Sequence, residues 1–300
     1  MKRPNLFIVG APKCGTSSLH NYLDQHPQIF MTQQTKEPAY FCTDLRVNES
    51  RRTRDTHSYL ALFAEARQEK HLGESTVWNL CSRVAARDIQ AWDPAAKIII
   101  MLRNPVDAMY SLHGQFLWSC NEDIVDFEQA LAAEDDRRHG RRIPPEAHSP
   151  DGLLYTRVFS FAEQVARYYG VFPPDQIKVI IFDDFVKDTA RVYRETLEFL
   201  GVDPAFQATL EVVNPAKPAP LAFNRFFARR PALRSAVHRL VPAALKRKLM
   251  ELVPRLTPTV DRPARIDPEL RGRLLPRLAA DVEQLSKLLN RDLTHWCKPS

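Results

Sequence analysis

The stretch LFIVGAPKCGTSSL, residues 6–19, decides the fold. Its apolar start ends at Gly10, which predicts a short buried strand, and apolar residues then recur at helical spacing over 16–25. Between the two lies a glycine loop that leads directly into the helix N-terminus. Unpaired backbone N–H groups and the helix dipole stabilise an anion at such a position, so the stretch predicts a strand, an anion-binding loop and a helix.

The lysine of this loop, Lys13, comes earlier than the lysine of a nucleoside-triphosphate loop, which directly follows the second glycine. Thr16 occupies that position here. A lysine inside the loop suits a shorter anion, and the hydroxyl groups of Thr16, Ser17 and Ser18 add donors at the first helical turn. A tight turn with a solvent-exposed lysine is the alternative that the loop alone leaves open.

Two further apolar runs, 97–102 and 176–182, predict strands. Helical patterns separate or follow them at 82–92, 105–118, 159–169 and 268–289. This alternation predicts a three-layer, P-loop-like α/β fold: a central parallel sheet flanked by helices, with a helical C-terminal extension. Ligands of such sheets bind beyond the carboxyl ends of the strands, so Arg103, directly after the first of these runs, is expected at the same edge as the glycine loop.

The composition is that of an ordinary globular protein, with 300 residues, 44% apolar and 26% charged. The formal charge of +6 favours anionic ligands without separating nucleic acid, anionic lipid and a small phosphate compound. No apolar run approaches the roughly 18 residues of a membrane span, and the N-terminus lacks a secretory signal, so a cytoplasmic location is expected. Five scattered cysteines without a CxxC pair predict free thiols and no zinc site.

Two segments are less regular. Residues 134–151 are charged and contain prolines, which predicts a mobile surface loop. Residues 223–255 carry nine lysines and arginines against one acid, with apolar residues between them. This basic segment is expected to be a helical surface with solvated arginines. A lid over the acceptor site and a dock for an anionic membrane surface are the open alternatives.

Two motifs, PKCGTSSL at 12–19 and LRNPVDAMYS at 102–111, resemble the donor-binding motifs of PAPS-dependent sulfotransferases; PAPS is 3′-phosphoadenosine 5′-phosphosulfate. Further similar stretches are 26–41, 72–85, 168–185 and 288–296. The resemblance follows the bacterial and Golgi carbohydrate-type branch. It implies a single sulfotransferase domain over 1–300, with a basic helical insertion or lid at about 220–257. It also implies an enzyme that moves a sulfuryl group from PAPS to an acceptor hydroxyl, less readily an amine, and releases 3′,5′-ADP (PAP).

The resemblance implies which residues bind the donor. Lys13 would stabilise the charge that builds up on the departing phosphate. Arg103 and Ser111 would hold the 3′-phosphate, since a guanidinium forms paired hydrogen bonds with phosphate oxygens. An ion pair with Asp107 is the alternative for Arg103. The expected donor-binding residues are Lys13, Cys14, Gly15, Thr16, Ser17, Ser18, Arg103 and Ser111.

A general base must remove the proton of the acceptor hydroxyl. Glu37, in the sequence KEP at 36–38, aligns with the glutamate that heparan-type family members use for this purpose. A solvated charged turn is the alternative, and His20 and His113 are rival bases. In the family, a segment similar to residues 74–76 often carries a lysine after its glutamate. Ser75 stands there in this chain, which weakens any substrate-orienting role of that segment.

The acceptor is not specified by any motif. The resemblance favours a carbohydrate or glycolipid hydroxyl, while a small natural product, a carrier-bound acyl chain and a protein tyrosine stay open. Neither a metal, a redox cofactor nor a nucleic-acid partner is expected, and peripheral association with an anionic membrane surface stays open. A P-loop nucleotide kinase or NTPase is the rival enzyme class. It would need a lysine after Gly15 and an acidic metal ligand, which Asp183 or Asp184 could imitate.

Overall fold

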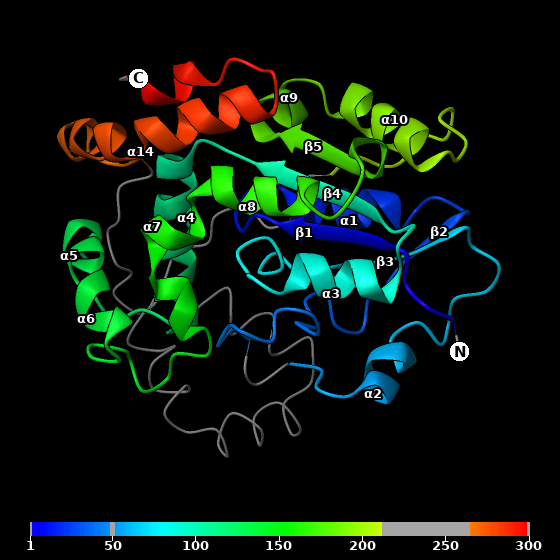
Figure 1. Ribbon diagram of the computed structural model, residues 1–300, viewed down its shortest axis with the longest axis horizontal. Helices are drawn as coiled ribbons and strands as arrows, with labels where there is room; N and C mark the ends of the chain where they lie inside the picture. The colour runs from blue at the N-terminus through cyan, green and yellow to red at the C-terminus, as the bar shows by residue number, and fades with distance from the viewer. Residues whose placement is uncertain (1, 49–51, 212–264, 299–300) are drawn as a thin grey trace, which may run out of the picture.

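The computed structural model describes residues 2–48, 52–211 and 265–298 (Figure 1). The basic segment 223–255, expected to be a helical surface with a lid or a membrane dock as open alternatives, lies outside the described residues. At the centre is a sheet of five strands in the order β2-β3-β1-β4-β5. All its neighbouring strands are parallel. The strands are β1 (Leu6–Gly10), β2 (Ile29–Met31), β3 (His71–Ser75), β4 (Lys97–Leu102) and β5 (Ile177–Ile181).

The helices cover both faces of the sheet, as the three-layer expectation requires. The helix α1 (Thr16–Leu23) packs on one face, whereas α3 (Ala85–Trp92) and α8 (Phe161–Tyr169) pack together on the other (Figure 1). The remaining helices of the described residues are α2 (Thr56–Ala61), α4 (Pro105–Ser119), α5 (Phe127–Ala132), α6 (Glu134–Arg138), α7 (Tyr155–Val158), α9 (Phe182–Lys187), α10 (Thr189–Leu200) and α14 (Pro268–Leu288), with short 3-10 turns at Pro150–Leu153, Pro174–Gln176 and Thr294–Cys297. The central strand β1 is buried along its whole length, since layers lie on both sides of it.

The C-terminal helical extension that the sequence predicts is α14, and it is bound to the domain by specific contacts. Arg271 forms an ion pair with Asp107 of α4 at 2.5 Å. The carboxylate of Asp281 accepts hydrogen bonds from the backbone N–H groups of Phe161 and Ala162 at the start of α8. Among the described residues, no helix is both long and apolar enough to cross a membrane.

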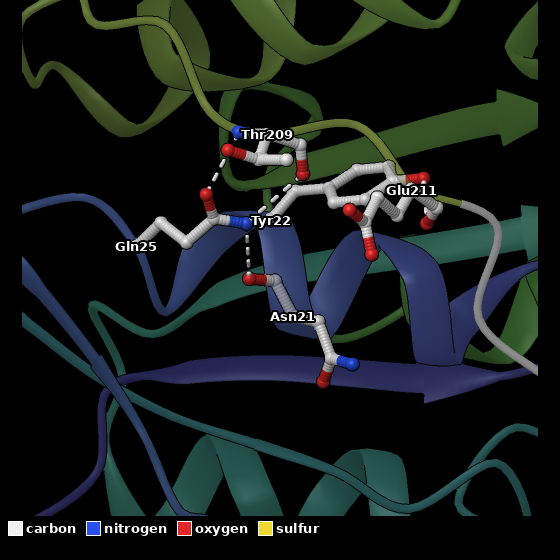
Figure 2. A pocket seen from close by; sticks show the side chains of 5 residues that line it. All are labelled: Asn21, Tyr22, Gln25, Thr209 and Glu211. Atoms are coloured by element: carbon white, nitrogen blue, oxygen red, sulfur yellow. Dashed lines mark hydrogen bonds between the residues drawn. The ribbon is translucent and has the colours of Figure 1, made fainter.

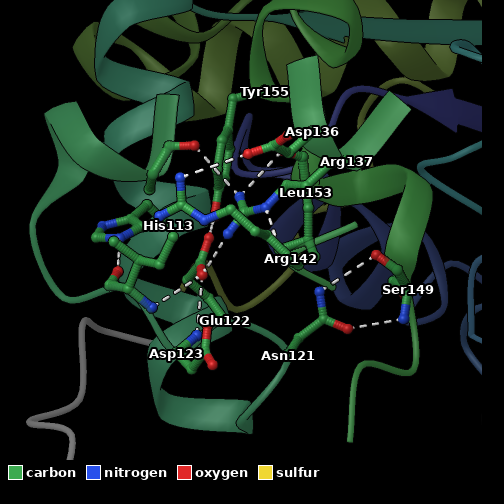
Figure 3. A network of polar contacts seen from close by, with 12 residues as sticks. His113, Asn121, Glu122, Asp123, Asp136, Arg137, Arg142, Ser149, Leu153 and Tyr155 are labelled. Atoms are coloured by element: carbon green, nitrogen blue, oxygen red, sulfur yellow. Dashed lines mark hydrogen bonds and ion pairs between the residues drawn. The ribbon is translucent and has the colours of Figure 1, made fainter. Parts of the chain in front are cut away.

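The expectation of a mobile surface loop over 134–151 is wrong. Within it, the side chain of Arg137 is completely buried and forms an ion pair of 2.7 Å with Glu122, which is also completely buried. Glu122 accepts a further hydrogen bond from the hydroxyl of Tyr155 at 2.9 Å (Figure 3). Buried charges are tolerated only when they are paired and hydrogen-bonded, so Arg137 anchors this charged segment in the interior of the domain, although residues 138–142 are exposed.

Candidate functional site

The glycine loop between β1 and α1 has a backbone that only glycine permits at its two ends. A Cβ atom on Gly10 would lie 2.5 Å from Leu80 Cβ, and Gly15 has a φ of 90° with the ring of Phe182 directly beside it. Among the described residues, no side chain caps the N-terminus of α1. The first-turn N–H groups therefore face the loop and suit an anion there.

Lys13 and Arg103 meet at this loop, as the sequence predicts for residues at the carboxyl ends of two neighbouring strands. A guanidinium nitrogen of Arg103 lies 3.5 Å from the backbone oxygen of Lys13, and the guanidinium lies 4.7 Å from the ring centre of Phe182. The ammonium of Lys13 donates to the side-chain oxygen of Gln115 on α4 at 2.8 Å. Burial lowers the pKa of Lys13, and the neighbouring charges of Arg103 and Lys36 lower it further.

The alternative partner of Arg103, Asp107, is engaged elsewhere, because it pairs with Arg271. Ser111 lies on α4, the helix that begins just after Arg103, and is half-buried. The contact of Ser111 with a 3′-phosphate stays a prediction.

Lys36 supplies a third cation beside the glycine loop, although it belongs to the segment after β2. The sequence did not predict it as a site residue. Its ammonium donates to Ser17 Oγ on the first turn of α1 at 2.5 Å. Among the described residues, no carboxylate forms an ion pair with Lys13, Lys36 or Arg103. Three cations that form no ion pair with a carboxylate of the described residues, beside an uncapped helix N-terminus, fit a ligand that carries several negative charges.

Glu37, the expected base, follows Lys36 and is half-buried. Its Oε2 accepts a hydrogen bond of 2.8 Å from the side-chain amide of Asn48. The backbone N–H of Asn48 donates to Ser149 Oγ at 3.0 Å, and the backbone N–H of Ser149 donates to Asn121 at 2.7 Å (the last pair is drawn in Figure 3). Two loops far apart in the sequence, residues 45–48 and residues 148–151, therefore hold the carboxylate of Glu37.

The same two loops are joined by an ion pair. The guanidinium of Arg46 lies 2.9 Å from Asp151, whose other carboxylate oxygen accepts the backbone N–H of Arg46 at 2.7 Å.

Residues 3–215 match the family model described as sulfotransferase domain. The chain belongs to the sulfotransferase family. The crystal structure of a sulfotransferase from Alicyclobacillus acidocaldarius is 30% identical, with a TM-score of 0.75, over 99% of this chain and 100% of that one.

Curated relatives include carbohydrate sulfotransferase 15 of Mus musculus, 23% identical over 67% of this chain. The chain spans 44% of the length of that relative. Heparan sulfate glucosamine 3-O-sulfotransferase 6 of Homo sapiens is 27% identical over 83% of this chain and 68% of its own length.

The two rival bases of this sulfotransferase-family chain are buried in structural contacts. The ring of His20 lies 2.8 Å from Ser75 Oγ, and burial together with the charge of Lys36 lowers the pKa of His20 to about 3. A group with so low a pKa is a weak base. His113 is completely buried, and its Nε2 lies 2.9 Å from the carbonyl oxygen of Ile124 within the network of Figure 3. Glu37 is the candidate that these contacts favour.

Glu74 in this sulfotransferase domain anchors the segment that carries Glu37. Its carboxylate is completely buried and accepts hydrogen bonds from Thr76 Oγ1 at 2.6 Å and from Asn79 at 3.2 Å. Thr76 Oγ1 in turn accepts the backbone N–H of Ala39 at 3.3 Å. Burial raises the pKa of Glu74 to about 8, so its carboxyl group is mostly protonated at neutral pH.

Cys14, which the sequence places in the donor-binding set, points into the core. Its side chain is completely buried, and burial raises the pKa of the thiol to about 12. The backbone of Cys14 is therefore the part that can contact a ligand, and the thiol is unreactive at neutral pH.

An open pocket at the other end of α1 is a poor candidate for the donor site (Figure 2). The side chain of Gln25 bridges its walls, with hydrogen bonds to the backbone oxygens of Asn21 and Thr209. Among the described residues that line it, Glu211 is charged and none is a lysine or arginine. An anionic donor is favoured at the N-terminus of α1 instead.

Proposed function

We propose that this protein is a PAPS-dependent sulfotransferase that transfers a sulfuryl group to a hydroxyl of a carbohydrate or glycolipid and releases PAP. The observation that carries this proposal is the convergence of Lys13, Lys36 and Arg103 on the uncapped start of α1, with Glu37 adjacent in sequence to Lys36. Relatives named carbohydrate sulfotransferase and heparan sulfate glucosamine sulfotransferase support the acceptor class.

The residues of the site can each perform one step of in-line transfer. PAPS supplies a sulfuryl group whose bond to a phosphate oxygen breaks while a bond to the acceptor oxygen forms. Lys13 and the N–H groups of α1 stabilise the electron pair left on that phosphate oxygen. Arg103 and Ser111 hold the 3′-phosphate, and Glu37 takes the proton of the acceptor hydroxyl. Asn48 keeps the carboxylate of Glu37 in place through its 2.8 Å hydrogen bond.

The rival class, a nucleotide kinase or NTPase, finds little support in this site. Thr16 rather than lysine follows Gly15. The two candidate metal-binding acids are already engaged: Asp184 pairs with Arg291 at 2.5 Å, and Asp183 accepts the indole N–H of Trp296 at 3.0 Å.

Calorimetric titration of the full-length protein with PAP, and separately with ATP and Mg²⁺, tests the donor. We expect saturable PAP binding without added metal and weak or absent ATP binding. Tight, Mg²⁺-dependent ATP binding without PAP binding would contradict the proposal. Transfer of label from [35S]PAPS to a panel of oligosaccharides and glycolipids then tests the acceptor class, with small phenols as the comparison. Labelling of the phenols alone would contradict a carbohydrate acceptor.

A further inference from the structure

Lys36 connects the segment of the expected base to the helix that binds the donor. It precedes Glu37 in the sequence, yet its ammonium reaches across to Ser17 Oγ at 2.5 Å. Ser17 belongs to the uncapped first turn of α1. Lys36 is half-buried, so its ammonium has lost part of its water shell, and this burial lowers the pKa of the group. A partly desolvated ammonium beside an anion-binding helix turn is suited to a bound anion.

Lys36 and Lys13 lie near the start of α1 on opposite sides of strand β1, which precedes that helix. The side chain of Lys13 extends toward Gln115 on α4, which follows β4, and the backbone oxygen of Lys13 lies 3.5 Å from the guanidinium of Arg103. Lys36 follows β2, which lies on the other side of β1. A bound donor would have its 3′-phosphate at Arg103 and its transferred group facing Glu37. Lys13 would then lie beside the middle of the donor, and Lys36 beside the end that carries the transferred group.

We propose that Lys36 binds the sulfonate oxygens of PAPS and makes the site distinguish PAPS from PAP. This assignment rests on the proposed function. Arg103 is expected to contact a 3′-phosphate that both compounds share, whereas Lys36 contacts a group that PAP lacks. When PAP is bound, the ammonium keeps its hydrogen bond to Ser17 Oγ.

The position of Lys36 also couples donor binding to the placement of the base Glu37. Because Glu37 is its immediate neighbour, an ammonium held on the sulfonate also fixes the backbone that carries the base. Ala39, a little further on, is already anchored through Thr76 Oγ1 at 3.3 Å. Binding of PAPS therefore places the carboxylate of Glu37 next to the group that is transferred, whereas with PAP the ammonium of Lys36 stays on Ser17 Oγ.

Binding of PAPS and PAP, measured by calorimetry on the full-length protein, tests the proposal without any acceptor. We expect Lys36→Met to weaken PAPS binding by at least about tenfold, the size of a lost charged hydrogen bond, and PAP binding by less than about twofold. Lys36→Arg keeps the charge and should retain most of the preference for PAPS. Lys178→Met is the matched control, since Lys178 is also half-buried with a pKa lowered by burial but lies on β5, and it should change neither affinity.

The outcomes separate this assignment from the proposed function. Equal losses of PAPS and PAP binding in Lys36→Met would overturn it, because Lys36 would then bind a group that both compounds share. Unchanged PAPS binding would overturn it as well. If the unaltered protein bound neither compound, the proposed function would fail and this assignment with it. Thermal unfolding of each variant checks the fold, and Lys36→Gln, which also removes the charge, gives the same comparison should Lys36→Met not fold.

Discussion

Asn48 and Glu37 are joined by a hydrogen bond of 2.8 Å, in which the side-chain amide donates to the carboxylate. Asn48 is itself held by Ser149, and Ser149 by Asn121. The geometry of the expected base thus depends on Ser149, which lies more than a hundred positions further along the chain. The contribution of each of these residues to activity can be measured by substituting it alone.

Glu37→Gln should abolish the base while leaving the shape of the site intact. We expect kcat to fall by about 100-fold or more, the usual contribution of a positioned general base, with the affinity for PAP unchanged. Steady-state kinetics with PAPS and calorimetry with PAP provide the two measurements. Full activity in this variant would transfer the role of base to another residue.

Asn48→Ala should remove the hydrogen bond that orients Glu37. Because the base remains but is less well placed, we expect kcat to fall by about tenfold while the KM for PAPS stays the same. Asn21→Ala is the control, since Asn21 lies toward the other end of α1, at the pocket of Figure 2. A rise in KM without a fall in kcat would mean that Asn48 contacts a substrate rather than the base.

Arg103→Ala should weaken PAPS binding by about tenfold or more through loss of a charged phosphate contact. Adenosine 5′-phosphosulfate lacks the 3′-phosphate, so its already weaker binding should change little. Competition calorimetry with the two compounds measures the difference. Equal losses for both would remove Arg103 from the 3′-phosphate site.

Glu122→Gln should destabilise the domain because it leaves the buried Arg137 without a counterion. Breaking a buried pair costs about 3–5 kcal/mol, which a lowered urea midpoint would show. Lys287→Ala removes an ion pair on the surface of α14, whose two side chains are 73% and 64% exposed, and should leave the midpoint unchanged. Similar midpoints for the two variants would mean that the buried pair is not a source of stability.

Glu74 should make stability depend on pH. Its pKa is about 8 in the folded chain against an ordinary value of 4.5, so the folded state holds a proton that the unfolded state releases between these values. This contribution is fully present below pH 4.5 and is lost as pH rises through about 8. Relative to the unaltered protein, Glu74→Gln should therefore be more stable at pH 8 than at pH 5. Urea unfolding at both pH values measures the change, and an equal difference at both would contradict it.

The sequence predicted those parts of the fold that depend on local pattern. The strand at 97–102 has the predicted bounds, because an apolar run followed by Arg103 leaves little ambiguity. By contrast, β3 reads HLGES and has no apolar run, yet it is completely buried. Its polar side chains are tolerated because Thr76 bonds Glu74 and His20 bonds Ser75, and the second of these contacts is between residues far apart in the sequence.

The candidate site likewise has one part that the sequence could predict and one that it could not. The meeting of Lys13 and Arg103 follows from the rule that parallel strands end at one edge, and it could be predicted. The contact between Lys36 and Ser17 depends on how the segment after β2 folds back over α1, for which the sequence carries no local signal. The burial of Arg137 was missed for a similar reason: a charged residue in a proline-containing segment resembles a surface loop until its partner Glu122 is known.

The ion pair between Arg46 and Asp151 bears on how the acceptor preference of this chain can be re-engineered. A chimera that received only loop 45–48 or only loop 148–151 from a relative would lose this ion pair and the hydrogen bond from the backbone N–H of Asn48 to Ser149 Oγ. The graft would then disturb catalysis even if it bound the new acceptor. Loops 45–48 and 148–151 should be exchanged together, as one cassette.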